Sequence, residues 1–259
     1  MPGPPATPDP TLSNVKALTF DVFGTVVDWR STVTTALQNT AASSSNPTLA
    51  NVRRDWDHFA QLWRNSYGQF TRNFIPGQTS WKDIDTHHRD SLLSLLADWD
   101  LADTLTPEEV EQLTKTWHFL TPWSDSSAGI QRLGTKYVTA TLSNGNTSLL
   151  NDLNESGKLH FQRIISAADF KAYKPNAKVY LGACETLGLE PEQVAMVAAH
   201  LGDLAAAREL GFRTVYVERP GEEEWEPEEE RYAEARKWVD VWIGEGEGGL
   251  EEVARRLVA

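Results

Sequence analysis

Cysteine is nearly absent from this chain. Cys184 is the only one among 259 residues, so no internal disulfide can form, and the composition suits a reducing, cytoplasmic compartment. Basic residues are also scarce: 24 Lys and Arg stand against 37 Asp and Glu, which gives a formal net charge of −13. Because this charge repels phosphates, we expect no nucleic acid and no anionic membrane as a partner.

Long hydrophobic runs are missing as well. No stretch approaches the roughly 18 consecutive apolar residues of a membrane span, and the first ten residues lack the basic and apolar regions of a secretory signal. We interpret the proline-rich residues 1–13 as a disordered tail and the acidic residues 222–230 as a solvated loop. The histidines outside residue 200 lack metal-ligand spacing, so we predict no metal site and no cofactor.

The pattern of apolar runs predicts an α/β fold. Short runs rich in β-branched residues, apolar on both faces as in buried parallel strands, occupy residues 15–21, 137–143, 163–167, 194–199, 213–217 and 239–243. Helical patterns occupy residues 146–155, 175–187, 204–210 and 250–257, with Pro175 as a first helical residue and Gly188 as a helix stop. This alternation is typical of a doubly wound, Rossmann-like parallel sheet.

Residues 31–122 interrupt the alternation and contain no convincing strand. Trp56, Phe59 and Trp63 fall on one face at helical spacing, and further amphipathic patterns predict an all-helical insertion. We therefore expect a core domain of residues 14–30 and 123–259. The helical insertion would lie over the carboxyl ends of the strands, where open α/β sheets bind ligands.

Polar residues follow several of the predicted strands. Asp21 ends the first one, Gly24 allows a sharp turn, and the Thr25 hydroxyl can orient the carboxylate. An acid at this position can act as a nucleophile that forms an ester, although an Asp in a strand-end turn is also common. Ser143 with Asn144, Lys174 with Tyr180, and His200 with Asp203 occupy comparable places, which predicts one crevice lined by all of them.

At these positions the sequence resembles the type II haloacid dehalogenases of the haloacid dehalogenase superfamily. The motif FDVFGTVVDW at residues 20–29 carries most of the resemblance, and it is supported by LSNG at 142–145, KPNAKVY at 174–180 and VAAHLGDLAAARELG at 197–211. The resemblance covers roughly residues 15–220. It implies a core with a helical cap, a small 2-haloacid as substrate, and a homodimer.

The resemblance also implies a mechanism. Asp21 attacks Cα of the haloacid and expels halide, and water activated by Asp203 then hydrolyses the aspartyl ester. Lys174 keeps Asp21 ionised. Tyr180 packs at the edge of the site and bonds the lysine or an acid.

The same resemblance assigns the binding groups. The Ser143 hydroxyl and adjacent backbone amides bind the substrate carboxylate, and Asn144 and a cap arginine stabilise the halide. The context Leu-Trp-Arg favours Arg64 as that arginine, with Arg53, Arg54 and Arg72 as alternatives. Phe23, Trp63 and Trp81 are candidates to line an apolar pocket, although aromatic residues on a cap helix are often simply core.

The alternative is a phosphatase, or another hydrolase, of the same superfamily. Such phosphatases carry a second Asp where this chain has Phe23, and a metal-binding Asp where it has Ala198. A halide leaves without a proton, and displacement at carbon gives Mg²⁺ no phosphoryl charge to neutralise, so the loss of both acids favours carbon–halogen chemistry.

The chain departs from the best-known dehalogenase pattern around the last motif. His200 replaces an asparagine, and Gly202 replaces a bulky tryptophan, which predicts a wider pocket. Two roles are open for His200. It could assist in activating the water, because its ordinary pKa is near neutrality, or it could donate a structural hydrogen bond to Asp203.

Overall fold

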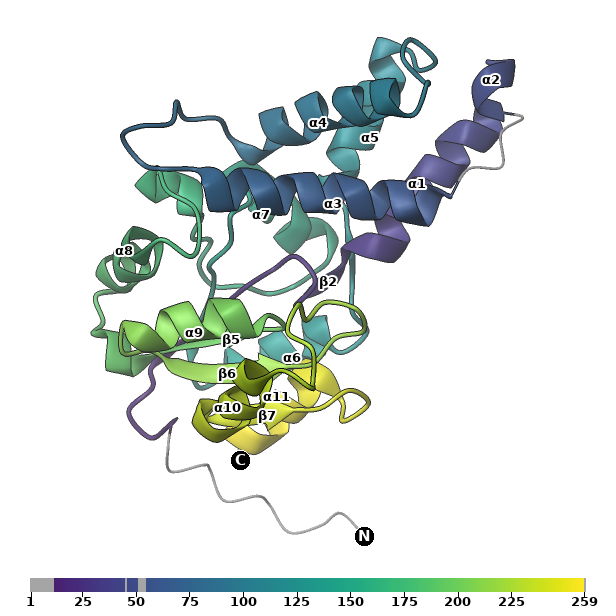
Figure 1. The fold of residues 1–259 in the computed structure, drawn as a ribbon. Coiled ribbons are helices and arrows are strands. Elements are labelled where there is room, and N and C mark those ends of the chain that lie inside the picture. Colours follow the sequence, from purple (N-terminus) through teal and green to yellow (C-terminus); the bar gives the residue numbers. More distant parts are fainter. Residues whose placement is uncertain (1–11, 45, 51–54, 259) are drawn as a thin grey trace, which may run out of the picture.

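A parallel sheet forms the centre of the molecule in the computed structural model, which describes residues 12–44, 46–50 and 55–258 (Figure 1). The strand order is β4-β1-β5-β6-β7, and every neighbouring pair is parallel. The strands are β1 (Ala17–Phe20), β4 (Val138–Thr141), β5 (Val194–Ala198), β6 (Arg213–Val217) and β7 (Val241–Ile243). The predicted α/β class is confirmed.

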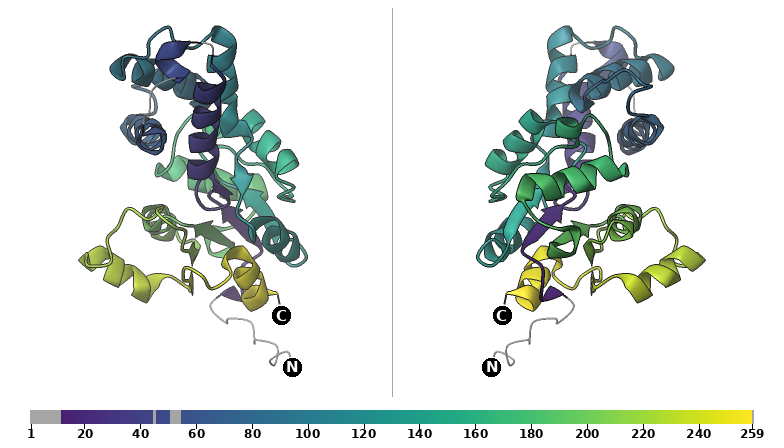
Figure 2. Two further views of the ribbon diagram at one scale, coloured as in Figure 1. Left: turned by 90° about the vertical axis from the view of Figure 1, so that its right-hand side faces the viewer. Right: turned by 90° about the vertical axis from the view of Figure 1, so that its left-hand side faces the viewer.

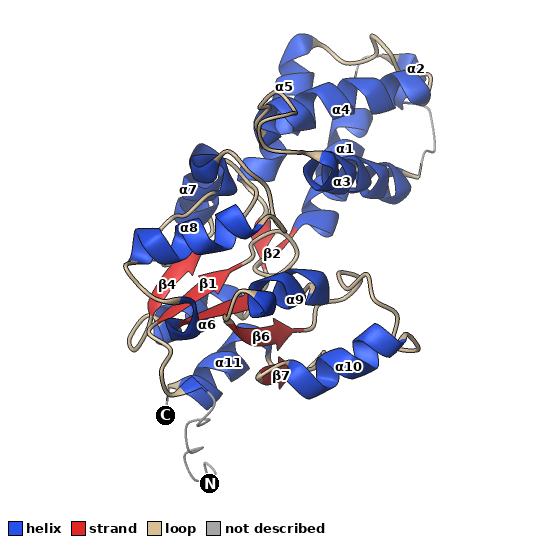
Figure 3. Ribbon diagram, turned by 60° about the vertical axis from the view of Figure 1, so that its left-hand side comes forward, coloured by secondary structure: helices blue, strands red, loops and turns tan. Residues whose placement is uncertain are grey.

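Helices cover both faces of this sheet, as the alternation predicts (Figure 3). One face carries α8 (Ala177–Leu187), α9 (Leu201–Glu209) and α10 (Glu230–Trp238); α6 (Ser126–Leu133) and α11 (Gly249–Leu257) pack together on the other. Another helix, α7 (Thr147–Ser156), follows β4. The sheet is nearly inaccessible to solvent, because β1 and β5 are buried along their whole length.

A second layer of helices, here called the cap, stands over the carboxyl ends of the strands (Figure 2). It consists of α1 (Trp29–Ser43), α2 (Pro47–Ala50), α3 (Trp56–Asn73), α4 (Ile84–Asp98), α5 (Pro107–Lys115) and the short 3₁₀ helix η2 (Thr116–His118). The chain enters the cap through β2 (Val27–Asp28) and leaves it through β3 (Thr121–Pro122), which pair as an antiparallel ribbon. The expectation of no strand in residues 31–122 therefore missed β3. A strand of this length is too short to show a repeating pattern of apolar residues.

Two local expectations were wrong. Residues 163–167 form only isolated bridges, because the Thr141 side chain bonds both the N–H (2.9 Å) and the carbonyl (3.0 Å) of Ile165 in place of a backbone ladder. Helix α8 begins at Ala177 rather than Pro175, since the Asn176 side chain caps it by accepting from the N–H of Lys178. The helix stop at Gly188 is confirmed, with φ +65°.

Residues 1–11 of the expected tail lie outside the described residues, and Leu12 is already part of the hydrophobic core. None of the helices in the described ranges is long and apolar enough to cross a membrane.

Candidate active site

The loops after the carboxyl ends of β1, β4, β5 and β6 meet beneath the cap. They enclose a cavity of about 400 Å³ whose walls come from both layers. The core contributes Asp21, Asn144, Lys174, Tyr180, His200 and Asp203 to the lining. The crevice predicted from strand-end polar residues is therefore present, and the cap closes it from above.

Asp21 lies at the bottom of this cavity and is only 7% exposed. Its Oδ1 accepts a hydrogen bond from Lys174 Nζ at 2.9 Å, and its Oδ2 accepts one from Thr25 Oγ1 at 2.8 Å. The Thr25 hydroxyl is itself oriented, because its oxygen accepts the N–H of Ala199 at 2.9 Å. The carboxylate is thus fixed in one orientation at the end of β1.

Charge keeps this carboxylate ionised. Burial alone would raise the pKa of Asp21, but the Lys174 ammonium and the His200 ring outweigh burial and hold that pKa well below its usual range. Burial would lower the pKa of Lys174, and the carboxylates of Asp203 and Asp21 instead raise it. At neutral pH the pair is an anion and a cation, which is the state a carboxylate nucleophile needs.

A second carboxylate shares the same lysine. Asp203, in the first turn of α9, accepts from Lys174 Nζ at 2.5 Å and from the Tyr180 hydroxyl at 2.6 Å. Burial and the neighbouring Asp203 raise the pKa of Tyr180, so the phenol stays protonated and donates. Lys174 thereby connects Asp21 and Asp203, the two acids that the sequence singled out. Of the two partners expected for Tyr180, a lysine or an acid, the structure shows the acid.

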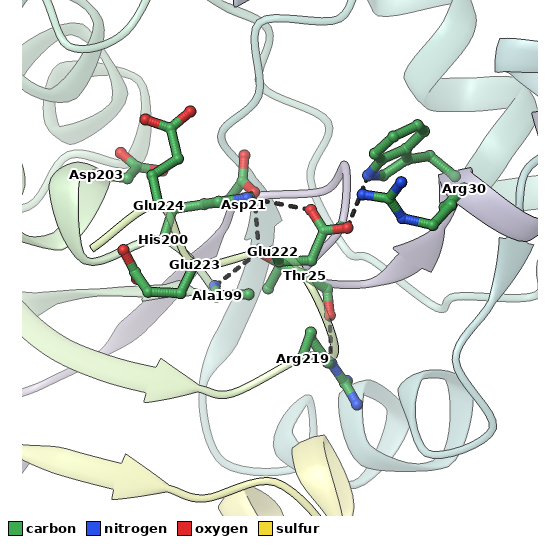
Figure 4. A network of polar contacts seen from close by, with 12 residues as sticks. Asp21, Thr25, Arg30, Ala199, His200, Asp203, Arg219, Glu222, Glu223 and Glu224 are labelled. Carbon is green, nitrogen blue, oxygen red and sulfur yellow. Dashed lines mark hydrogen bonds and ion pairs between the residues drawn. The ribbon is translucent and has the colours of Figure 1, made fainter. Parts of the chain in front are cut away.

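His200 lies against Asp21 and Glu222, so the expected hydrogen bond to Asp203 is not formed. Its Nδ1 lies 3.1 Å from Asp21 Oδ2 and its Nε2 lies 3.3 Å from Glu222 Oε2 (Figure 4). Asp203 is bonded to Lys174 and Tyr180. Burial would lower the pKa of His200, but hydrogen bonds and charge from Asp21 and Glu222 raise it to about 10. The two carboxylates therefore favour a protonated ring, whereas a general base would have to be deprotonated.

Glu222 is a site residue that the sequence analysis missed. Residues 222–230 were expected to be solvated, yet Glu222 is buried and its Oε1 accepts the indole N–H of Trp29 at 2.8 Å. Gly24, at φ +83°, makes room for it, since a Cβ there would lie 1.9 Å from Glu222 Oε2. The signal that could have found Glu222 is its place after β6, because every other strand-end loop in the site had supplied a polar residue.

An ion pair anchors the loop that carries Glu222. Arg219 donates to the Thr25 carbonyl at 3.0 Å and forms a two-pronged bridge to Asp125 at 2.8 and 2.7 Å. Further along, Glu223 accepts the N–H of Leu201 at 2.7 Å. The loop is therefore attached to both the β1 loop and the start of α9.

Arg64 reaches the cavity from α3 of the cap. Its guanidinium lies 4.6 Å from the Tyr67 ring centre and 5.7 Å from those of Phe23 and Trp29. Its Nη1 is buried and has no hydrogen-bond partner in the part of the chain that the structure describes. Arg72, also on α3, lies among the cavity-lining residues too, but it is mostly exposed and pairs with Glu224 at 3.3 Å. Arg53 and Arg54 lie outside the described residues.

Several predicted site residues support the cavity without lining it. Ser143 is fully buried and its Oγ accepts the N–H of Gly145 at 3.3 Å, so it shapes the turn after β4 rather than facing a ligand. Asn144 does line the cavity, and its Oδ1 accepts the Lys174 N–H at 2.8 Å. Phe23 is 1% exposed and packs its edge against Tyr67.

The expected aromatic lining needs correction. Trp63 is core: it is fully buried and donates its indole N–H to the His88 carbonyl and to Ser91 Oγ, both at 3.1 Å. Trp81 stacks on Tyr173 outside the cavity. The aromatic residues that line the cavity include Trp29, Tyr67 and Trp225.

Trp225 borders the space beside Gly202, where the sequence predicts a wider pocket. Its indole nitrogen lies 3.9 Å from the point where a Cβ on Gly202 would be, and both residues line the cavity. The space that a larger residue at 202 would fill is thus bordered by an aromatic ring from the loop after β6. Over the described ranges, no group of three or more His, Cys, Asp or Glu residues is arranged to hold a metal ion.

Comparison with known proteins agrees with this geometry. The sequence model of the haloacid dehalogenase-like hydrolase family matches residues 15–211. The (S)-2-haloacid dehalogenase 4A of Burkholderia cepacia is 27% identical over 216 residues, which is 81% of this chain and 86% of that one. Among solved structures, the defluorinating L-2-haloacid dehalogenase Rha0230 is 33% identical with a TM-score of 0.84, over 98% of this chain and 100% of that one. The L-2-haloacid dehalogenase PA0810 is also 33% identical, with a TM-score of 0.80 over 94% and 99%.

Proposed function

Because the chain belongs to the haloacid dehalogenase-like hydrolases, we propose that it hydrolyses the carbon–halogen bond of small 2-haloacids through an ester on Asp21. The observation that carries this proposal is that an ionised, immobilised Asp21 shares its cavity with the Arg64 guanidinium, whose buried Nη1 has no hydrogen-bond partner among the described residues. A carboxylate supplies the attacking oxygen, and the guanidinium supplies a cation for the departing anion.

The first half-reaction uses both layers. An Asp21 oxygen attacks Cα of the haloacid in line with the C–X bond, and the bonding electron pair leaves with the halide. Arg64, with the Asn144 amide, stabilises the anion that develops in a pocket walled by Trp29 and Tyr67. Removal from bulk water strengthens that electrostatic interaction.

The second half-reaction uses the core alone. Water attacks the Asp21 carbonyl carbon, and Asp203, held by Tyr180 and Lys174, takes the proton. The Lys174 ammonium contacts both Asp21 and Asp203, so it can return a proton to the product oxygen as the ester opens.

The same site lacks an acid that phosphate-ester hydrolysis would need. The position of a second acid is occupied by Phe23, which packs among aromatic rings and carries no proton to give to an alcohol. The halide mechanism needs no such acid. We therefore place the chain with the dehalogenases rather than with the phosphatases of the family.

The relatives narrow the substrate. Several carry names with the (S)- or L-2-haloacid, so we expect the (S) enantiomer of 2-chloropropionate to be the better substrate. A neighbour is named as defluorinating, and fluoroacetate belongs in the same panel. The substrate is a small molecule. We also propose that the protein is a cytoplasmic homodimer, and light scattering after gel filtration would measure its oligomeric state.

A paired assay tests the function. Halide release from (S)-2-chloropropionate is measured beside turnover of p-nitrophenyl phosphate with Mg²⁺, for the wild-type protein and for Asp21→Asn. We expect halide release from the wild type alone, since an amide oxygen is a far poorer nucleophile than a carboxylate. Phosphatase activity without halide release, or a freshly purified Asp21→Asn protein that still releases halide, would contradict the proposal.

A further inference from the structure

The two oxygens of Asp21 are held in different ways. Among the described residues Oδ1 accepts from one donor, Lys174 Nζ, whereas Oδ2 accepts from both Thr25 Oγ1 and His200 Nδ1. The Thr25 hydrogen must point at Asp21, because the Thr25 oxygen already accepts the Ala199 N–H. Oδ1 therefore has the freer lone pairs and is the better attacking atom. Once Oδ1 is alkylated, Oδ2 is the carbonyl oxygen of the ester and keeps both donors.

The partners of His200 fix its charge. Its two ring nitrogens each lie against a carboxylate oxygen, Asp21 Oδ2 on one side and Glu222 Oε2 on the other. Carboxylates only accept, so both nitrogens carry hydrogen and the ring is an imidazolium. Ester formation removes the charge of Asp21. Glu222, buried and also bonded to Trp29, is the carboxylate that still contacts the ring afterwards.

We infer that His200 and Thr25 form the oxyanion hole of the second half-reaction, and that Glu222 is the positioning residue that keeps His200 cationic through it. This rests on the proposed aspartyl ester. When water attacks Cγ of Asp21, its proton goes to Asp203 and the carbonyl electron pair moves onto Oδ2. There it meets the His200 N–H and the Thr25 O–H. Collapse returns the pair, breaks the Cγ–Oδ1 bond, and releases a hydroxyacid whose alkoxide oxygen takes a proton from Lys174. Asp203 passes its proton to Lys174 across their hydrogen bond, and Asp21 loses the second proton of the water to solvent as it ionises again.

A general-base role for His200 makes the opposite prediction for pH. A base must be deprotonated, so hydrolysis of the ester would accelerate as pH rises through the pKa of His200. An oxyanion donor must be protonated, so hydrolysis would slow over the same range. The charged groups that face His200 are Asp21 from the β1 loop and Glu222 and Glu223 from the loop after β6. Of these, Glu222 is the one whose hydrogen bond and charge survive the alkylation of Asp21.

The test separates the two half-reactions. Rapid mixing with (S)-2-chloropropionate gives ester formation as the burst of halide, and intact-protein mass against time gives ester hydrolysis, both as a function of pH. The variants are His200→Asn and Glu222→Gln. Glu228→Gln is the matched control, because Glu228 is exposed on the same loop and does not line the cavity.

We expect His200→Asn to hydrolyse the ester about a hundredfold more slowly, as for loss of an oxyanion donor, while its halide burst changes far less. Glu222→Gln should slow hydrolysis about tenfold at neutral pH and move the falling limb of its pH profile to lower pH, since the ring has lost its second anion. Both variants should accumulate ester, and Glu228→Gln should match the wild type.

The outcomes separate this inference from the proposed function. Hydrolysis that accelerates as pH rises, or a Glu222→Gln variant with the wild-type profile and no accumulated ester, would overturn the oxyanion hole. Absence of any ester on the wild type or on Asp203→Asn would overturn the aspartyl-ester mechanism itself. If a variant fails to fold, the sign of the wild-type profile still decides between donor and base.

Discussion

Replacing Arg64 with methionine should separate activity from stability. The change keeps the aliphatic stem of the side chain but removes the cation held over the rings of Phe23, Trp29 and Tyr67. Loss of one such electrostatic donor typically costs about 3–4 kcal/mol of barrier, so halide release should slow by about two to three orders of magnitude. Hydrolysis of an ester once formed should be unchanged, since the residues of that step lie in the core.

The effect of this substitution on folding should be small or favourable. The buried, partnerless Nη1 carries a desolvation penalty of about 1–3 kcal/mol, and cation–π contacts return about 0.5–2 kcal/mol. These terms nearly cancel, so the midpoint of thermal unfolding of Arg64→Met should stay at or above the wild-type value.

Arg72→Met is the control for charge on the same helix. Arg72 is 56% exposed and bridges Glu224, a surface pair worth about 0–1 kcal/mol. Stopped-flow halide release and a thermal melt on both variants check the argument. Equal halide-release rates in the two variants, or a marked fall in the melting midpoint of Arg64→Met, would refute the reasoning.

Three further predictions follow from the same geometry. Dialysis against EDTA should leave halide release intact, because Ala198 stands where a metal-binding acid would be required, and a loss restored by Mg²⁺ would contradict this. Trp225→Ala should open the cavity beside Gly202 and raise kcat/KM for longer 2-haloacids relative to 2-chloropropionate by about tenfold, which is the discrimination typical of one or two methylene groups. An unchanged ratio would show that the Trp225 ring does not limit the length of the substrate. Burial would lower the pKa of His118, but the hydrogen bonds that its ring donates to two carboxylates, including Asp85 of the cap, raise it, so this contact stabilises fully below the unfolded value of about 6.5 and is lost as pH rises through the folded pKa. The unfolding free energy of His118→Asn should accordingly fall short of the wild type by about 1 kcal/mol near pH 5.5, and denaturant titrations should show the gap narrowing as pH rises through the folded pKa of His118.

Apolar runs and strand-end polar residues predicted the parallel sheet correctly. That signal is strong because strands such as β5 are buried on both faces and must be apolar throughout. The weaker points were places where one side chain replaces backbone pairing, as Thr141 does at residues 163–167. Single-residue events of this kind leave no period in the sequence.

The partners of the predicted site residues were harder to foresee. Asp21, Lys174 and Asp203 meet because each follows or begins an element whose place the sheet dictates. Glu222 was read as solvated because acidic runs usually are, and nothing local distinguishes it from Glu223 and the acids that follow. Its burial depends on the space above Gly24, which is a tertiary property.

The ribbon of β2 and β3 is the joint through which the chain passes into the cap and out of it, and it lies between two kinds of chemistry. Arg64 belongs to the cap side of that joint, whereas the groups assigned to opening the ester belong to the sheet side. Changing the cap therefore alters the cation offered to the leaving group, while Asp21, Lys174 and Asp203 keep the positions that the sheet gives them. Trp29 links the two sides, because its indole N–H, on the cap side, bonds Glu222 on the sheet side.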